Sequence, residues 1–130
     1  MSTPRGIRNN NPLNIKKGNY FLGEQHPQTD PEFEQFLSMA HGIRAGFKIL
    51  KNYIKRGYNT PELIIRRWCP DSTAESYIQT VCTRSGLSRT GRLAFQDSTR
   101  MCDLVEAMCF VECGRPIDKR VISTAYYMSI

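Results

Sequence analysis

The stretch TRMCDLVEAMCFVEC, from Thr99 to Cys113, predicts a helix whose apolar face carries a carboxyl group. At about 100° per residue, one narrow stripe of this helix holds Met101, Val105, Met108 and Glu112. A carboxyl group in such a stripe loses hydration, so its pKa rises and it stays protonated at neutral pH. A protonated carboxyl can donate a proton in catalysis, which makes Glu112 the first candidate for a catalytic acid.

Gly114 follows this stretch and is typical of the residue that ends a helix, so we expect Glu112 at a rim that a substrate can reach. A Glu in the last turn of a helix can also bend out to solvent or pair with Arg115. The stripe alone leaves both interpretations open.

Length and charge narrow the class of protein. A chain of 130 residues suits one domain with a single core, and residues 1–130 are expected to form it. The net charge of +6 favours a polyanionic partner, either nucleic acid, an anionic membrane surface, or the bacterial cell wall with its teichoic acids and peptide carboxylates. There is no apolar run of about 18 residues and no basic-then-apolar leader, so we expect neither a membrane span nor a cleaved signal peptide.

The five cysteines do not form a metal-binding pattern. The sequence has no C-x-x-C pair, and His26 and His41 lie far from the cysteines along the chain, so no metal and no cofactor are expected. A reduced protein made in the cytoplasm is the expectation. A disulfide between Cys69 and Cys82 is left open.

The expected fold is mainly α, an α+β domain with a small N-terminal β-hairpin. Residues 5–40 are rich in Asn, Gly and Pro and predict loop and β structure, with hairpin strands at Asn19 to Leu22 and Glu32 to Phe36. From His41 onward, apolar residues recur with a helical period. Residues typical of helix N-caps precede the later segments: Thr60, Ser72, Asp97 or Ser98, and Asp118. Glu75 completes a capping box, S-x-x-E, with Ser72.

The run RGIRNNNPLNI offers several amide side chains to a ligand. Donors and acceptors suited to the hydroxyls and acetamides of sugars are carried by Asn9, Asn10, Asn11 and Asn14. A tight turn held by Asn side chains explains the same run. Trp68 can likewise stack on a sugar face or pack in the core.

Short motifs along the chain resemble a family of phage virion and prophage proteins described as lysozyme-like or structural. They are R-G-I-R-N-N-N-P-x-N-I at Arg5 to Ile15, F-x-x-F followed by G-I-R-A at Phe33 to Ala45, L-x-x-Y at Leu50 to Tyr53, I-I-x-R-W-x-P at Ile64 to Pro70, T-x-x-x-Y-x-x-x-V at Thr73 to Val81, and E-x-G at Glu112 to Gly114. The match covers nearly the whole chain in order. It implies a lysozyme-like helical domain.

A second resemblance, to lytic transglycosylases and flagellar-rod-type glucosaminidases, bears on mechanism. In those families a catalytic Glu ends a helix and an Asn-rich cleft stretch follows, whereas here the two occur in the opposite order, which a circular permutation explains. The resemblance implies that Thr73 and Tyr77 join Glu112 in catalysis, as in the glucosaminidase element Y-A-T-x-x-x-Y. Asp71 stands where that element has its first Tyr, and we include it with Trp68 among the expected substrate-binding residues.

Cleavage of a glycosidic bond needs an acid and a group that manages the oxocarbenium-like centre. Three residues are candidates for a second carboxylate: Asp30, Glu34 and Asp71. None has an apolar setting like that of Glu112. A one-carboxylate mechanism, as in lytic transglycosylases, is therefore favoured, with Tyr77 and Thr73 positioning substrate or water.

The sequence therefore favours a phage lysis or virion protein, or an antibacterial effector, that cleaves peptidoglycan glycan strands as a muramidase or lytic transglycosylase. Without a signal peptide it would reach the periplasm or cell wall after release, injection or secretion, and an inhibitor, immunity protein, or secretion or virion component would be a further partner. One alternative is a non-catalytic cell-wall-binding or virion structural module. A small basic nucleic-acid-binding protein is disfavoured because the basic stretch SGLSRTGRLAF has no accompanying recognition motif.

Overall fold

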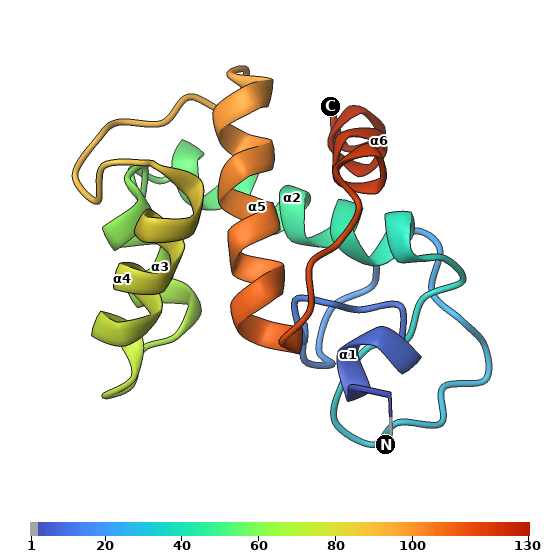
Figure 1. Ribbon diagram of the computed structural model, residues 1–130. Helices are drawn as coiled ribbons and strands as arrows, with labels where there is room; N and C mark the ends of the chain where they lie inside the picture. Colours follow the sequence, from blue (N-terminus) through green and yellow to red (C-terminus); the bar gives the residue numbers. More distant parts are fainter. Residues whose placement is uncertain (1–2) are drawn as a thin grey trace.

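The protein is mainly helical, as the sequence predicts (Figure 1). The computed structural model describes residues 3–130. In this part of the chain the helices are α1 (Arg5–Arg8), α2 (Met39–Lys55), α3 (Pro61–Trp68), α4 (Ala74–Ser85), α5 (Ser98–Cys113) and α6 (Lys119–Ser129). None of these helices combines the length and apolar character needed to cross a bilayer.

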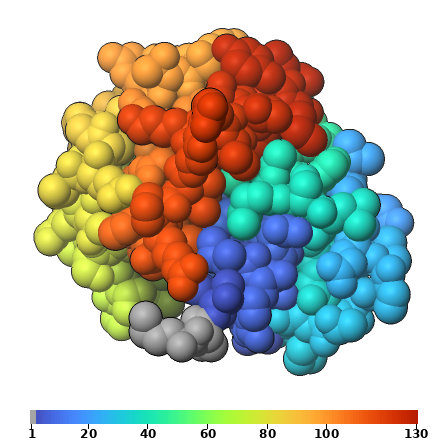
Figure 2. All heavy atoms as spheres, turned by 45° about the vertical axis from the view of Figure 1, so that its right-hand side comes forward, coloured from blue at the N-terminus to red at the C-terminus, as the bar shows by residue number. Residues whose placement is uncertain are grey.

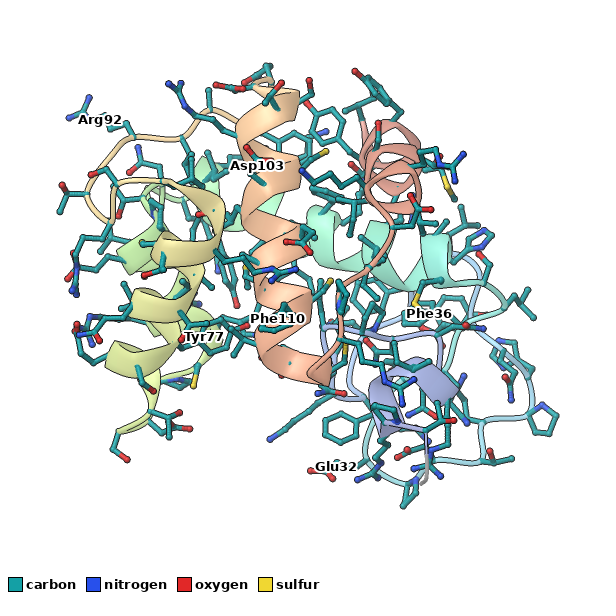
Figure 3. The ribbon with its side chains drawn as sticks, in the orientation of Figure 1. Glu32, Phe36, Tyr77, Arg92, Asp103 and Phe110 are labelled. Carbon is teal, nitrogen blue, oxygen red and sulfur yellow. The ribbon has the colours of Figure 1, made fainter. Side chains whose placement is uncertain are left out.

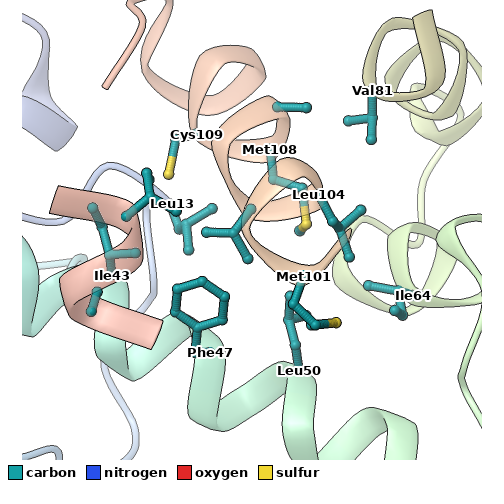
Figure 4. Packing of buried hydrophobic residues seen from close by; sticks show 14 of the residues in the cluster. Leu13, Ile43, Phe47, Leu50, Ile64, Val81, Met101, Leu104, Met108 and Cys109 are labelled. Atoms are coloured by element: carbon teal, nitrogen blue, oxygen red, sulfur yellow. The ribbon is translucent and has the colours of Figure 1, made fainter. Parts of the chain in front are cut away.

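Helix α5 runs through the middle of the molecule, with α3 and α4 on one side and α6 on the other (Figure 1). Its apolar residues Met101, Leu104 and Met108 are fully buried. They pack in one core with Phe47 and Leu50 of α2 (Figure 4). The apolar stripe predicted for this helix, which includes Glu112, therefore lies on the face of α5 that packs against the core.

Most of the predicted helix boundaries are confirmed. The side chains of Thr60, Asp97 and Asp118 each accept a hydrogen bond from a backbone N–H in the first turn of α3, α5 and α6. Gly86 and Gly114 end α4 and α5 in the left-handed conformation, with φ of 75° and 73°, which glycine adopts without a steric penalty.

The predicted capping box at α4 is wrong. In the described chain no side-chain hydrogen bond caps this helix. Glu75 instead pairs with Arg89 at 2.7 Å and with Arg66 of α3 at 2.8 Å, and these hydrogen bonds and charges lower the pKa of Glu75 to about 2. Two charge-assisted pairs outweigh one backbone cap. The ion pair between Arg66 and Glu75 therefore connects α3 to α4, the helices that carry Trp68 and Tyr77.

The predicted N-terminal hairpin is also wrong. The segment from Glu32 to Leu37 makes only isolated antiparallel bridges, from Phe33 to Lys16 and from Phe36 to Glu24. Its partners belong to two separate stretches because the chain between them turns away at Gly18 and Gly23, where φ is positive. A ladder needs consecutive paired residues, so a loop results. Sequence analysis also missed the single helical turn of α1.

All five cysteines are free, so the disulfide left open between Cys69 and Cys82 is not formed. The N-terminal loop packs closely on α2. A Cβ at Gly42 would lie only 1.8 Å from the backbone oxygen of Asn10, and one at Gly46 only 2.2 Å from Leu13. These two glycines let the loop approach the helix and thereby fix its position.

Gly42→Ala should destabilise the protein, because the new methyl group meets backbone that cannot rotate away. We expect a loss of about 1–3 kcal/mol in the free energy of unfolding, although Ala favours a helix more than Gly does. Urea denaturation measures it. Gly91→Ala is the control, since its Cβ would meet Ser88 at 3.4 Å, and it should stay within about 0.5 kcal/mol of the parent. A free energy of unfolding that is the same in Gly42→Ala as in the parent would contradict the close packing of the loop on α2.

Candidate functional site

Three side chains from three other segments donate hydrogen bonds to the carboxyl group of Glu112. The Tyr77 hydroxyl and Trp68 Nε1 reach Oε2 at 3.0 and 3.2 Å. Asn14 Nδ2 reaches Oε1 at 3.3 Å and the backbone oxygen of Glu112 at 3.1 Å. The side chain is therefore turned inward, and within residues 3–130 it forms no ion pair with Arg115.

Burial raises the pKa of Glu112 above its ordinary value, and the hydrogen bonds from Tyr77, Asn14 and Trp68 lower it by less. Two opposing effects act on one group. Desolvation disfavours the carboxylate, whereas each donor stabilises it. The net result is a half-buried acid that holds its proton at higher pH than an exposed Glu.

Each donor is placed by its own element. Asn14 adopts the left-handed conformation, with φ of 53°, which Asn tolerates better than most residues. Trp68 is the last residue of α3. Tyr77 is 5% exposed on α4 and points toward the end of α5 (Figure 3). Figure 2 shows the N-terminal residues, in blue, against the end of α5 and the following linker, in orange and red.

A cleft of about 790 Å³ opens beside Glu112. It is lined by the N-terminal loop, α2, the end of α3 and the end of α5. Its lining residues are Asn14, Ile15, Lys16, Asn19, Phe21, Phe33, Lys48, Ile49, Asn52, Tyr53, Trp68, Cys69, Pro70, Asp71 and Glu112. A mixture of apolar, aromatic and few polar groups is usual in ligand sites.

The part of this cleft that α2 supplies is not predicted from the sequence. Lys48 and Asn52 lie one turn apart on α2, beside Ile49 and Tyr53. Burial raises the pKa of Tyr53. Polar residues one turn apart do mark an exposed helix face, but no local pattern in the sequence predicts that this face borders the same cleft as Glu112.

Of the four Asn residues predicted to bind substrate, only Asn14 lies at the cleft. Asn9 is buried and donates to Asp30 at 2.9 Å, and Asn11 donates to two backbone oxygens at 2.9 Å each. Asn10 donates to the backbone oxygen of Phe36. Their side-chain amides donate inside the loop, as the tight-turn interpretation predicts, so the structure does not bring Asn9, Asn10 and Asn11 to the cleft beside Glu112.

Thr73 and Asp71 form a second polar group. Asp71 lines the cleft, and its Oδ1 accepts hydrogen bonds from Thr73 Oγ1 at 2.5 Å, Thr73 N at 2.8 Å and Cys69 Sγ at 3.5 Å. These hydrogen bonds lower the pKa of Asp71. Thr73 itself does not line the cleft. Thr73 is predicted to position substrate or water, and in the structure its hydroxyl contacts Asp71 instead of the cleft.

The other two candidates for a second carboxylate lie elsewhere. Arg5 binds Asp30 through two nitrogens, at 2.6 and 2.7 Å, and holds the pKa of Asp30 well below its usual range. Glu34 is 4% exposed, and burial beside Glu24 raises its pKa. Neither lines the cleft. Both belong to the N-terminal loop, and Asp71 is left as the second carboxylate that borders the cleft with Glu112.

Comparison with known proteins relates the chain to bacteriophage proteins. It is similar to Protein P5 of Pseudoalteromonas phage PM2, with 45% identity over 96 residues. The match covers 68% of this chain and 60% of that protein, so the chain spans less than two thirds of its relative's length. No protein-family model matches the chain.

Glu112→Gln should stabilise the protein near neutral pH. The pKa of Glu112 is higher in the folded than in the unfolded chain, so the folded state binds more protons and the parent loses stability as pH rises from about 4.5 through the folded-state pKa. The Gln variant lacks this loss. Its advantage in free energy of unfolding should appear over that range, stay constant above it and be absent at lower pH. Urea denaturation at several pH values measures it, and equal stability at all of them would show that burial does not disfavour the carboxylate.

Proposed function

We propose that this protein cleaves the glycan strands of peptidoglycan with Glu112 as general acid. One observation carries the proposal: a half-buried carboxyl with a raised pKa, held by Tyr77, Trp68 and Asn14, borders a cleft of about 790 Å³. A carboxyl group with a raised pKa keeps its proton at higher pH than an exposed Glu does, and it can protonate the oxygen of a leaving sugar.

The position of each donor suits that role. Trp68 Nε1 and the Tyr77 hydroxyl both bond Oε2, and Asn14 bonds Oε1, so the plane of the carboxyl is fixed. After proton transfer these same donors stabilise the carboxylate that remains. Trp68 thus serves the acid directly through its indole N–H while its ring lines the cleft.

The contact between the N-terminal loop and the end of α5 supports the resemblance to lysozyme-like phage proteins with a permuted order. Asn14 belongs to the motif R-G-I-R-N-N-N-P-x-N-I, and Glu112 belongs to the helix that ends in E-x-G. A permuted lysozyme-like domain requires these two motifs to be neighbours. The similarity to a phage protein supports a phage protein over an effector. The proposed partner is peptidoglycan in the cell wall.

Glu112→Gln should abolish cleavage while the fold is retained, because Gln fills the same space without a transferable proton. On purified sacculi we expect the rate of muropeptide release to fall on the order of 10²- to 10⁴-fold. Glu106→Gln is the control on the same helix, since Glu106 pairs with Arg84 outside the cleft.

Three results would contradict the proposal. Release by the Gln variant at the parental rate would exclude Glu112 as the acid. Sedimentation of the parent with cell wall, without release of any fragment, would favour a non-catalytic binding module. Retention on DNA with a steep salt dependence, and no affinity for cell wall, would favour a nucleic-acid-binding protein.

Tyr77→Phe should shift the pH dependence of cleavage. Removal of the hydroxyl takes away one hydrogen bond to the carboxylate, so the pKa of Glu112 rises further. The alkaline limb of the pH–rate profile, where Glu112 loses its proton, should move to higher pH, while stability changes by about 1 kcal/mol. Tyr127→Phe, at a residue 58% exposed, should leave the limb in place. If the alkaline limb does not move in Tyr77→Phe, the Tyr77 hydroxyl does not influence the pKa of the catalytic acid.

A further inference from the structure

Asp71 is bound by the protein through one oxygen. Oδ1 accepts hydrogen bonds from Thr73 Oγ1, Thr73 N and Cys69 Sγ. Over residues 3–130 no donor reaches Oδ2. One oxygen therefore fixes the orientation of the carboxyl group, and the other is free to accept a proton on the border of the cleft that Glu112 shares.

We propose that Asp71 is the second catalytic carboxylate and acts as general base on the water molecule that attacks the anomeric carbon. This inference rests on the proposed function. It departs from the one-carboxylate mechanism that the sequence favours, and it makes the protein an inverting hydrolase instead of a transglycosylase.

The step balances with one water molecule. Its oxygen bonds to the anomeric carbon while the bond from that carbon to the leaving oxygen breaks. The water proton passes to Asp71 Oδ2, and the Glu112 proton passes to the leaving oxygen. Asp71 then releases its proton to solvent and Glu112 takes one up, which restores both groups.

The surroundings of the two carboxyl groups shift their pKa values in opposite directions. The pKa of Asp71 is lowered by its hydrogen bonds, and that of Glu112 is raised by burial. Divergent pKa values in one cleft are the usual mark of a base and an acid. The other charged or titratable groups that line the cleft are Lys16, Lys48, Tyr53 and Cys69, and those that face Glu112 from neighbouring elements or its own helix are Tyr77, Cys109 and Cys113.

Thr73 is a positioning residue in this arrangement. Its hydroxyl donates to Asp71 Oδ1 and favours the ionised form. Thr73→Val keeps the shape and the backbone donor but loses this hydrogen bond. The pKa of Asp71 should then rise, and the acid limb of the pH–rate profile should move to higher pH. If Thr73 served only to begin α4, the acid limb would stay in place in Thr73→Val.

The products of the parent protein give the first test. Mass spectrometry of muropeptides released from purified sacculi distinguishes reducing sugar ends, which contain the added water, from anhydro ends. We expect reducing ends, with inversion at the anomeric carbon seen by NMR of the fresh product. Anhydro ends would overturn the inference and leave the proposed function intact, because a transglycosylase needs only Glu112.

The second test replaces Asp71. Asp71→Asn should lower the rate on the order of 10²-fold or more, with little change in the thermal midpoint. Asp118→Asn is a matched control, because Asp118 Oδ1 likewise accepts from a backbone N–H two residues ahead, at 2.8 Å, at the start of a helix outside the cleft. It should retain full activity. Parental rates in Asp71→Asn would exclude Asp71 as the base.

Azide supplies a readout that a structural role cannot produce. In Asp71→Ala, azide ion needs no base and can take the place of water, so a glycosyl azide of inverted configuration should form. Its absence, together with anhydro products, would reject the inference. If the parent and every variant release nothing, the proposed function fails first, and the inference fails with it.

Discussion

The carboxyl group of Glu112 has to be satisfied inside the protein, and this requirement organises the site. Left without donors, a buried carboxyl would cost several kcal/mol or lose its charge altogether. Trp68, Tyr77 and Asn14 meet the requirement from α3, α4 and the N-terminal loop. Helix α5 supplies the acid, and its neighbours supply the environment that sets how tightly the acid holds its proton.

A second layer of contacts holds those donors in place. The ion pair of Glu75 with Arg66 connects α4 to α3, and Arg89 adds a second connection because it pairs with both Glu75 and Glu62 of α3. Tyr77 and Trp68 lie on these two connected helices. In the N-terminal loop, buried Asn9 and Asn11 occupy the polar groups that a loop would otherwise leave unpaired. These amides stabilise the loop that carries Asn14, which explains why most of an Asn-rich run with the donors and acceptors to bind sugars bonds to the chain itself.

Local patterns in the sequence predict the helices and the acid but not the contacts across the molecule. The apolar stripe, the caps at Thr60, Asp97 and Asp118 and the terminating glycines each depend on residues a few positions apart, so they can be read directly. The hairpin was predicted wrongly because pairing depends on partners that Gly18 and Gly23 separate. The part of the cleft that α2 supplies is not predicted for the same reason, since no local pattern brings Lys48 or Asn52 to the same cleft as Glu112.

The hydrogen bond from Asn14 to Glu112 joins residues 98 positions apart. Closing so long a loop carries a large entropic cost that only a folded core can offset. The Glu112 carboxyl and its hydrogen-bond donors therefore cannot assemble in a partly folded chain or in a fragment that lacks either side of this contact. Local opening of the N-terminal loop, with the helices still folded, would take the Asn14 donor away from Glu112, so the environment of this carboxyl depends on the loop as well as on the helices.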